Sequence, residues 1–91
     1  MPSLTATIIN KRGLHARAAA KFATLASEFE CDIQARTAGS AQWVDGKSVM
    51  SLMLLAAAQG TQLEICAEGQ DGDAAIKALC DLIDDYFEEG E

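Results

Sequence analysis

His15 is the only histidine in a chain of 91 residues, and it lies within the segment KRGLHARAAAKF, which spans residues 11–22. The alanine-rich run that follows predicts a helix beginning at Ala16, with His15 at the helix N-cap or just before it. Unpaired backbone N–H groups and the helix dipole create a positive field at such a position. Because this field opposes protonation of the imidazole, we expect a neutral, nucleophilic ring near neutral pH.

The neighbours of this histidine favour the binding of an anion attached to the ring. The free N–H groups of Ala16 and Arg17 can receive the anion, and the Arg17 guanidinium suits phosphate oxygens. Gly13 lets the chain bend before the helix. These parts fit a histidine that accepts and releases a phosphoryl group, not a hydrolase, because no acid–base partner lies nearby in the sequence. From the residues alone, an ordinary surface histidine at a helix start remains an alternative.

The net charge of −7 argues against a protein that binds nucleic acid through a basic surface. Acidic residues crowd the C-terminal third, and the segment from Asp81 onward is expected to be the solvated face and fraying end of a last helix. Cations flank the histidine instead: Lys11, Arg12, Arg17 and Lys21. An acidic body with one cationic spot favours a small anion bound there. A chance cluster of cations on a solvated face is the other interpretation.

Composition predicts a single domain over residues 1–91, located in the cytoplasm. Hydrophobic residues make up 49% of the chain, which argues against disorder. No run of about 18 apolar residues could insert into a membrane, and the N-terminus lacks the features of a signal peptide. The cysteines are odd in number and form no CxxC pair, so we expect reduced, mostly buried thiols and neither a metal site nor a cofactor. They are Cys31, Cys66 and Cys80.

Hydrophobic periodicity predicts the element order βαββαβα. Alternating patterns indicate strands over residues 4–9, 31–37, 41–44 and 61–67, and helical spacing indicates helices over residues 16–29, from Ser48 to Gly60, and from about Asp71 or Asp73 onward. One alternating face per strand favours an antiparallel sheet covered by helices on one side. The inward residues expected for the three helices are Ala18, Phe22, Leu25 and Phe29; Leu52, Leu55 and Ala56; and Ile76, Leu79, Cys80, Ile83 and Phe87.

Two motifs at their observed separation resemble the histidine-containing phosphocarrier protein (HPr) family of the bacterial phosphotransferase system. They are GLHARAAAKF at residues 13–22 and GKSVMSLMLLAAAQGTQLEI at residues 46–65. The resemblance covers essentially the whole chain, including the element order. It implies an α+β fold, an open-faced β-sandwich in which a four-stranded antiparallel sheet carries three helices on one face.

The same resemblance implies a phosphoryl carrier rather than an independent enzyme. Phosphorylation would occur at Nδ1 of His15, with Arg17 as the matching arginine and the backbone N–H of Ala16 beside the phosphate. The donor would be Enzyme I charged by phosphoenolpyruvate, and the acceptors would be IIA-type proteins or domains. The carrier is expected to act as a monomer.

Ser48 has two compatible interpretations. Its position before an apolar helical run predicts an N-cap. The resemblance adds regulatory phosphorylation of this serine by HPr kinase/phosphorylase, and a helix N-terminus tolerates a phosphate electrostatically. An alternative function follows, in which the chain is mainly a regulatory binding module that acts through its phosphorylation state.

One position departs from the family pattern. Ala18 stands where the family commonly has proline, and the resulting HARA form resembles variants of a nitrogen-related branch. Alanine is an excellent helix former, so the helix should survive the change. The sequence leaves the choice between a sugar branch and a nitrogen branch open.

An exposed patch for partner proteins is expected on the second helix. Outward methionines suit binding to several partners in turn, and the patch would lie near His15 if the first two helices start at one end of the molecule. The alternative is that these residues fill a core with few aromatics, and Trp43 is expected to pack on the sheet. The residues expected to dock partners are Ala20, Lys21, Lys47, Val49, Met50 and Met53.

Overall fold

The computed structural model describes residues 3–88 and has the predicted element order. The strands are β1 (Ser3–Thr7), β2 (Asp32–Thr37), β3 (Val44–Asp45) and β4 (Gln62–Glu68). The helices are α1 (Ala16–Ala26), α2 (Val49–Met53) and α3 (Gly72–Asp84), followed by the 3-10 helix η1 (Tyr86–Glu88). In this part of the chain, no helix is both long enough and apolar enough to cross a membrane.

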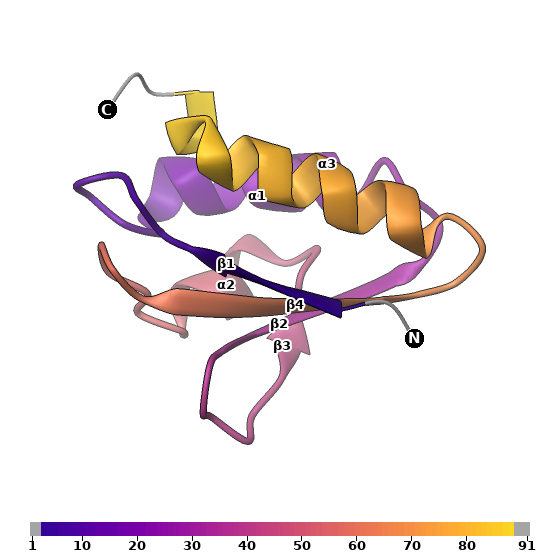
Figure 1. Ribbon diagram of the computed structural model, residues 1–91, viewed down its shortest axis with the longest axis horizontal. Coiled ribbons are helices and arrows are strands. Elements are labelled where there is room, and N and C mark those ends of the chain that lie inside the picture. Colours follow the sequence, from indigo (N-terminus) through magenta and orange to yellow (C-terminus); the bar gives the residue numbers. More distant parts are fainter. Residues whose placement is uncertain (1–2, 89–91) are drawn as a thin grey trace.

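The four strands form one antiparallel sheet in the order β1-β4-β2-β3. Ala6 of β1 and Thr37 of β2 both pair with Leu63 of β4, so β4 lies between two neighbours that precede it in the chain. Figure 1 shows α1 and α3 side by side over one face of the sheet. The shorter α2 contacts α1 and β3. The predicted open-faced α+β architecture is confirmed.

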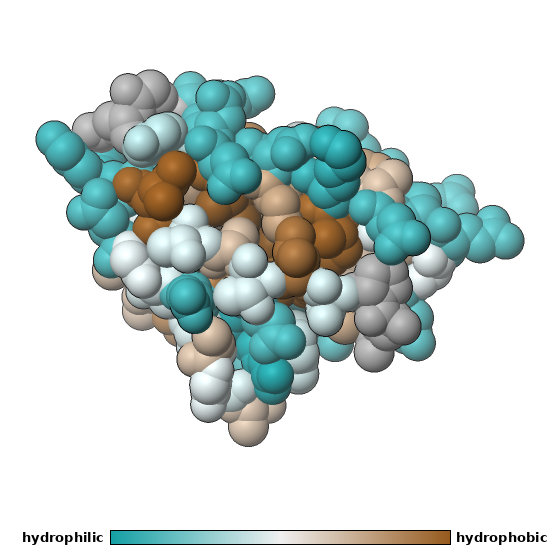
Figure 2. Space-filling view, viewed as in Figure 1, coloured by the Kyte–Doolittle hydropathy of each residue, from teal (hydrophilic) through white to brown (hydrophobic). Residues whose placement is uncertain are grey.

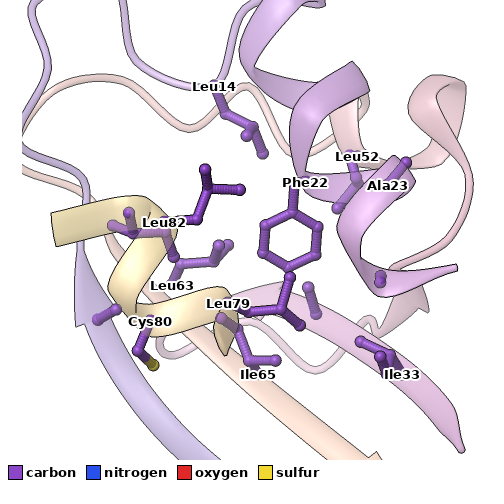
Figure 3. Close-up of a cluster of buried hydrophobic side chains, with 14 of the residues drawn as sticks. Leu14, Phe22, Ala23, Ile33, Leu52, Leu63, Ile65, Leu79, Cys80 and Leu82 are labelled. Atoms are coloured by element: carbon purple, nitrogen blue, oxygen red, sulfur yellow. The ribbon is translucent and has the colours of Figure 1, made fainter. Parts of the chain in front are cut away.

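The core lies between the helices and the covered face of the sheet. Phe22 of α1 is fully buried, and Figure 3 shows its ring among side chains from β4 and α3, including Leu63 and Leu79. Leu52 adds a buried side chain from α2. Most of the predicted inward positions of α1 and α3 are buried, whereas Leu25 and Phe29 are only partly buried against the core. All three cysteines are free and buried, as predicted.

The second helix is much shorter than predicted. It ends at Met53 instead of continuing to Gly60, although the alanine-rich sequence favours a helix there. Ala56 adopts a positive φ of 51°, which stops the helix, and it is exposed where an inward position was expected. Beyond it the backbone bonds to the start of the chain instead: the N–H of Gly60 donates to the carbonyl of Ile8 at 2.8 Å. Tertiary pairing therefore overrides local helix propensity.

The prediction of a strand over residues 41–44 is wrong, because only Val44 and Asp45 pair with β2. The preceding turn uses a local bond, in which the N–H of Gln42 donates to the Ser40 hydroxyl at 3.2 Å. Local bonds of this kind compete with strand pairing. The predicted helix over residues 16–29 ends early, at Ala26.

Trp43 is half-buried just before β3 and packs on a side chain of the sheet. The guanidinium carbon of Arg36, in β2, lies 4.3 Å from the centre of the Trp43 ring. The same guanidinium donates to a carboxylate oxygen of Glu64, in β4, at 2.9 Å. The residue thus stacks on an ion pair that bridges two strands, which agrees with the predicted packing role.

Asp71 connects the start of α3 to the turn between α1 and β2. It occupies the N-cap position, but its carboxylate makes no capping bond and accepts the N–H groups of Glu30 at 2.9 Å and Cys31 at 3.0 Å. The bond from the Glu30 N–H, followed by the Cys31 side chain, holds the pKa of Asp71 below its ordinary value. Asp71 therefore links the start of α3 to the backbone that follows α1.

We expect Asp71 to add stability that acid removes. Because its folded pKa is lowered, its contribution is present above the pKa of the unfolded chain and is lost as the pH falls through the folded pKa. Urea unfolding of the wild type and Asp71→Asn between about pH 5 and about pH 2 measures this. The stability difference between the two proteins should shrink in acid. A difference that stays constant or grows would contradict the assignment.

Candidate functional site

The loop between β1 and α1 carries the histidine and is fastened at several points. Its turn is closed by the N–H of Gly13, which donates to the carbonyl of Asn10 at 3.2 Å. Leu14 then donates its N–H to the carbonyl of Ala57 at 2.8 Å, and its side chain is buried in the core (Figure 3). The backbone is thereby fixed on both sides immediately before His15.

His15 is the N-cap residue of α1, and the helix begins at Ala16 as predicted. Its backbone is extended, with φ −79° and ψ 179°, and its carbonyl accepts the N–H of Ala19 at 2.8 Å. The imidazole is partly exposed and makes no capping hydrogen bond. The ring therefore stands at a helix N-terminus without occupying the first-turn N–H groups, which can receive an anion.

The predicted cations lie at or near the surface in the segments on either side of His15. Lys11, Arg12 and Arg17 are exposed, and Lys21 is half-buried. Arg17, Ala20 and Lys21 line a shallow groove of about 370 Å³ between α1 and the end of α3. Positive charge is thus present on the exposed surface of the histidine loop and along the adjoining surface of α1.

An acidic side chain lies opposite the basic residues of α1 across this groove. Glu88 of η1 lies 3.9 Å from the ammonium of Lys21 and lines the same groove. Asp81, Asp84 and Asp85 are exposed, in agreement with the predicted solvated face, and the predicted fraying end reaches beyond the described residues. Figure 2 shows hydrophilic side chains over α3. The cationic spot is therefore bordered by an acidic surface.

Ser48 caps α2 as predicted. Its hydroxyl oxygen accepts the N–H of Ser51 at 3.2 Å, and its carbonyl accepts the N–H of Leu52 at 3.0 Å. The side chain is partly buried. The capping role is therefore confirmed by the contacts of this residue.

The condition under which the α2 patch would lie near His15, that α1 and α2 start at one end of the molecule, is not met. The ammonium of Lys47, just before α2, donates to the carbonyl of Phe29 at 2.8 Å, beyond the end of α1. Ala57, after α2, bonds to Leu14 at the start of α1. The two helices therefore run in opposite directions, and α2 finishes, rather than starts, near His15. This direction follows from long-range contacts that helical periodicity does not encode.

The exposed residues on α2 match the expected docking patch only in part. Met50 is 80% exposed and Met53 is 46% exposed, as expected for outward residues. Val49 is instead partly buried against the core. Leu54 is 80% exposed and was not expected on this surface, although its spacing of four residues from Met50 places both on one helical face.

Residues 3–88 contain no cluster of three or more His, Cys, Asp and Glu side chains arranged to hold a metal ion. The candidate site thus consists of one imidazole, backbone N–H groups and nearby cations. This arrangement can hold a phosphoryl group on the ring and stabilise its negative charge.

Comparison with known proteins assigns the chain to a family. The family described as the PTS HPr component phosphorylation site matches residues 2–85. The phosphocarrier protein HPr of Pseudomonas aeruginosa is 51% identical over 91 residues, which is 100% of both chains. The phosphocarrier protein NPr of Shewanella violacea is 45% identical over 86 residues, covering 91% of this chain and 89% of the relative.

Solved structures agree with the sequence comparisons. HPr from Thermoanaerobacter tengcongensis superposes with a TM-score of 0.90 and 44% identity, covering 98% of each chain. An HPr dimer from the same organism superposes with a TM-score of 0.73 and 44% identity, covering 96% of this chain and 98% of the other. The fold and the site define a phosphocarrier of the phosphotransferase system. The chain belongs to the HPr family.

Gly13 is the position in the histidine loop that is least tolerant of a side chain. Its φ is +66°, and an added Cβ would lie 2.5 Å from the carbonyl oxygen of Ala57. We expect Gly13→Ala to destabilise the protein by about 1 kcal/mol or more and to displace the loop. Urea unfolding and the backbone amide resonances of residues 13–17 measure the two effects.

Gly39→Ala is the matched control, because Gly39 has a φ of +89° and no atom within 4 Å of an added Cβ. Gly39→Ala places an alanine at a positive φ, as Gly13→Ala does, but without a steric clash of the new Cβ. It should therefore destabilise the protein less and leave the resonances of residues 13–17 unchanged. Equal effects of the two substitutions would show that the collision with Ala57 has no energetic weight.

Proposed function

We propose that this protein accepts a phosphoryl group on Nδ1 of His15 from Enzyme I, which is charged by phosphoenolpyruvate, and passes it to IIA proteins or domains. The observation that carries this proposal is the place of His15 at the N-cap of α1, where a helix N-terminus presents N–H groups to an anion attached to the ring. Residues 1–91 would act as a single-domain, monomeric, cytoplasmic carrier and not as an independent enzyme.

The proposed transfer needs little machinery beyond position and charge. The Nδ1 atom of His15 attacks the phosphorus held by Enzyme I, and the bond between the phosphorus and the donor atom breaks with its electron pair returning to the donor. The backbone N–H of Ala16 and the guanidinium of Arg17 stabilise the negative oxygens. Transfer to a IIA protein reverses these roles, since the ring of His15 then becomes the leaving group.

Partner proteins would dock over the surface that surrounds the histidine. Exposed Met50 and Met53 supply adaptable apolar contacts, and Ala20 and Lys21 extend the surface onto α1. Val49 would contribute through its exposed part. Lys47 is the least suited of the proposed docking residues, because its ammonium already donates to Phe29. The exposed methionines suit successive short-lived complexes with different partners.

We further propose that Ser48 is a regulatory site phosphorylated by HPr kinase/phosphorylase. The hydroxyl is partly exposed at the start of α2, where the N–H of Ser51 already donates to it at 3.2 Å. A phosphate at this point keeps a favourable relation to the helix dipole. Its charge would stand beside the apolar docking surface of α2 and weaken the binding of partners there.

A second candidate function is regulation of nitrogen or carbon metabolism through the phosphorylation state, rather than sugar uptake. Two observations favour it: the similarity to an NPr protein, and Ala18, fully buried in the first turn of α1, where the family commonly has proline. Rates of phosphoryl transfer from a sugar-type and a nitrogen-type Enzyme I distinguish the two branches.

We expect His15→Ala to abolish the labelling that phosphoenolpyruvate and Enzyme I produce, because no other imidazole is present in the chain. Labelled wild type should lose its phosphate in mild acid, as a phosphoramidate does. Ser48→Ala, assayed in parallel, should label normally. Uptake of acid-labile phosphate by His15→Ala would place the phosphoryl group elsewhere.

Replacement of Ser48 separates capping from regulation. Ser48→Ala should lose about 1 kcal/mol of stability, whereas Ser48→Asn should keep the cap and most of the stability. With HPr kinase/phosphorylase and ATP, both variants should fail to take up the acid-stable phosphate that the wild type acquires. Urea unfolding and radiolabelling measure the two properties, and label retained by Ser48→Asn would refute the assignment.

A further inference from the structure

Asn10 is the only buried polar side chain in the part of the chain that the structure describes, and it is 1% exposed. It lies in the turn that precedes the histidine, five positions before His15. The chemistry attributed to the phosphoryl site does not use it. A buried amide in such a place calls for a physical reason, since an apolar side chain of similar size would need no hydrogen bonds.

The two ends of the turn are joined by a pair of bonds between Asn10 and Gly13. The side-chain Nδ2 of Asn10 donates to the carbonyl oxygen of Gly13 at 2.9 Å, and the Gly13 N–H donates to the carbonyl oxygen of Asn10 at 3.2 Å. Both polar groups of the Gly13 backbone are therefore held by one residue. The Gly13 carbonyl is part of the peptide bond to Leu14, the residue directly before the histidine.

The other half of the amide is not satisfied in the same way. The Oδ1 atom of Asn10 has no hydrogen-bond partner among residues 3–88. Burial of an unpaired acceptor is unfavourable, so stability alone does not account for asparagine at this position. What asparagine provides at this position is the hydrogen bond from its Nδ2 to the Gly13 carbonyl.

The bond acts on a backbone that is also in contact with the segment after α2. Gly13 has a positive φ of 66° and lies against the backbone of Ala57, and Leu14 is bonded to that same residue. With the Gly13 carbonyl fixed from the other side by Asn10, the peptide units leading to His15 are held in one orientation. The exposed side chains of Lys11 and Arg12 project from the two central positions of this turn.

We infer that Asn10 is a positioning residue for phosphoryl transfer, which sets the orientation of the His15 backbone at the start of α1 through its bond to the Gly13 carbonyl. The inference rests on the proposed function of His15. A reacting ring must be held within a fraction of an ångström of its productive place, and loss of one support can lower a rate about a hundredfold.

Three variants and one control test this inference. Asn10→Ala removes the donor, Asn10→Ser keeps a shorter and weaker one, and Asn10→Asp keeps the shape of the side chain but replaces the Nδ2 donor with an oxygen. The control is Asp71→Ala, which removes a comparable side-chain bond to the backbone at the opposite end of α1. Urea unfolding measures the stability of each.

Steady-state phosphorylation by Enzyme I, with phosphoenolpyruvate, separates kcat from KM. For Asn10→Ala and Asn10→Asp we expect kcat to fall about tenfold to a hundredfold with KM within about twofold of the wild type, since the docking surface is unchanged. Asn10→Ser should lie between these and the wild type. Asp71→Ala should keep the wild-type kcat even where it is equally destabilised.

A second readout needs no partner protein. In proton–nitrogen NMR spectra, Asn10→Ala should shift the backbone resonances of residues 13–17 and speed the solvent exchange of the Leu14 N–H, whereas Asp71→Ala should leave both unchanged.

Wild-type kcat and unchanged loop resonances in Asn10→Ala would overturn the inference, as would an equal loss of kcat in Asp71→Ala. If the wild type itself takes up no phosphate, the proposed function fails, while the NMR comparison still decides whether Asn10 orders the loop.

Discussion

The hydrogen bond from the Leu14 N–H to the Ala57 carbonyl is the contact on which the arrangement of the site depends. It joins the segment before α1 to the segment after α2, although the two are far apart in the chain. Gly13 makes this approach possible, because an added Cβ would lie 2.5 Å from the oxygen of Ala57. The segment before α1, the segment after α2 and the residues that follow β1 are thus joined, because Gly60 in turn donates its N–H to the carbonyl of Ile8.

This contact also determines the length and direction of α2. The residues after Met53 must turn back toward β1, and the positive φ of Ala56 provides that turn at the expense of an otherwise favourable helix. A longer α2 would carry Ala57 away from Leu14. The exposed apolar residues Met50 and Leu54 consequently lie on a short helix, and the segment that follows this helix is bonded to the loop that carries the histidine.

Local signals in the sequence were sufficient for the parts of the structure that local physics determines. The helix start at Ala16, the Ser48 cap and the apolar stripe of α3 follow from propensity, capping chemistry and spacing, and each is present. The early end of α2, its direction and the place of Lys47 on the Phe29 carbonyl depend on contacts between distant segments. Periodicity carries no information on such contacts, so the exposure and placement of the residues around α2 were predicted less well than the fold.

The two ends of α1 differ in how side chains contact the backbone near them. At its end, the Asp71 carboxylate accepts two backbone N–H groups and Lys47 donates to the Phe29 carbonyl, so exposed polar groups of the backbone are occupied. At its start, the N-cap residue His15 makes no side-chain capping bond, and a helix N-terminus presents N–H groups that suit an anion. A stabilising cap such as serine at residue 15 would occupy those groups. The weaker helix end is therefore the one that can receive a phosphoryl group, and the loop before it must be ordered by other contacts.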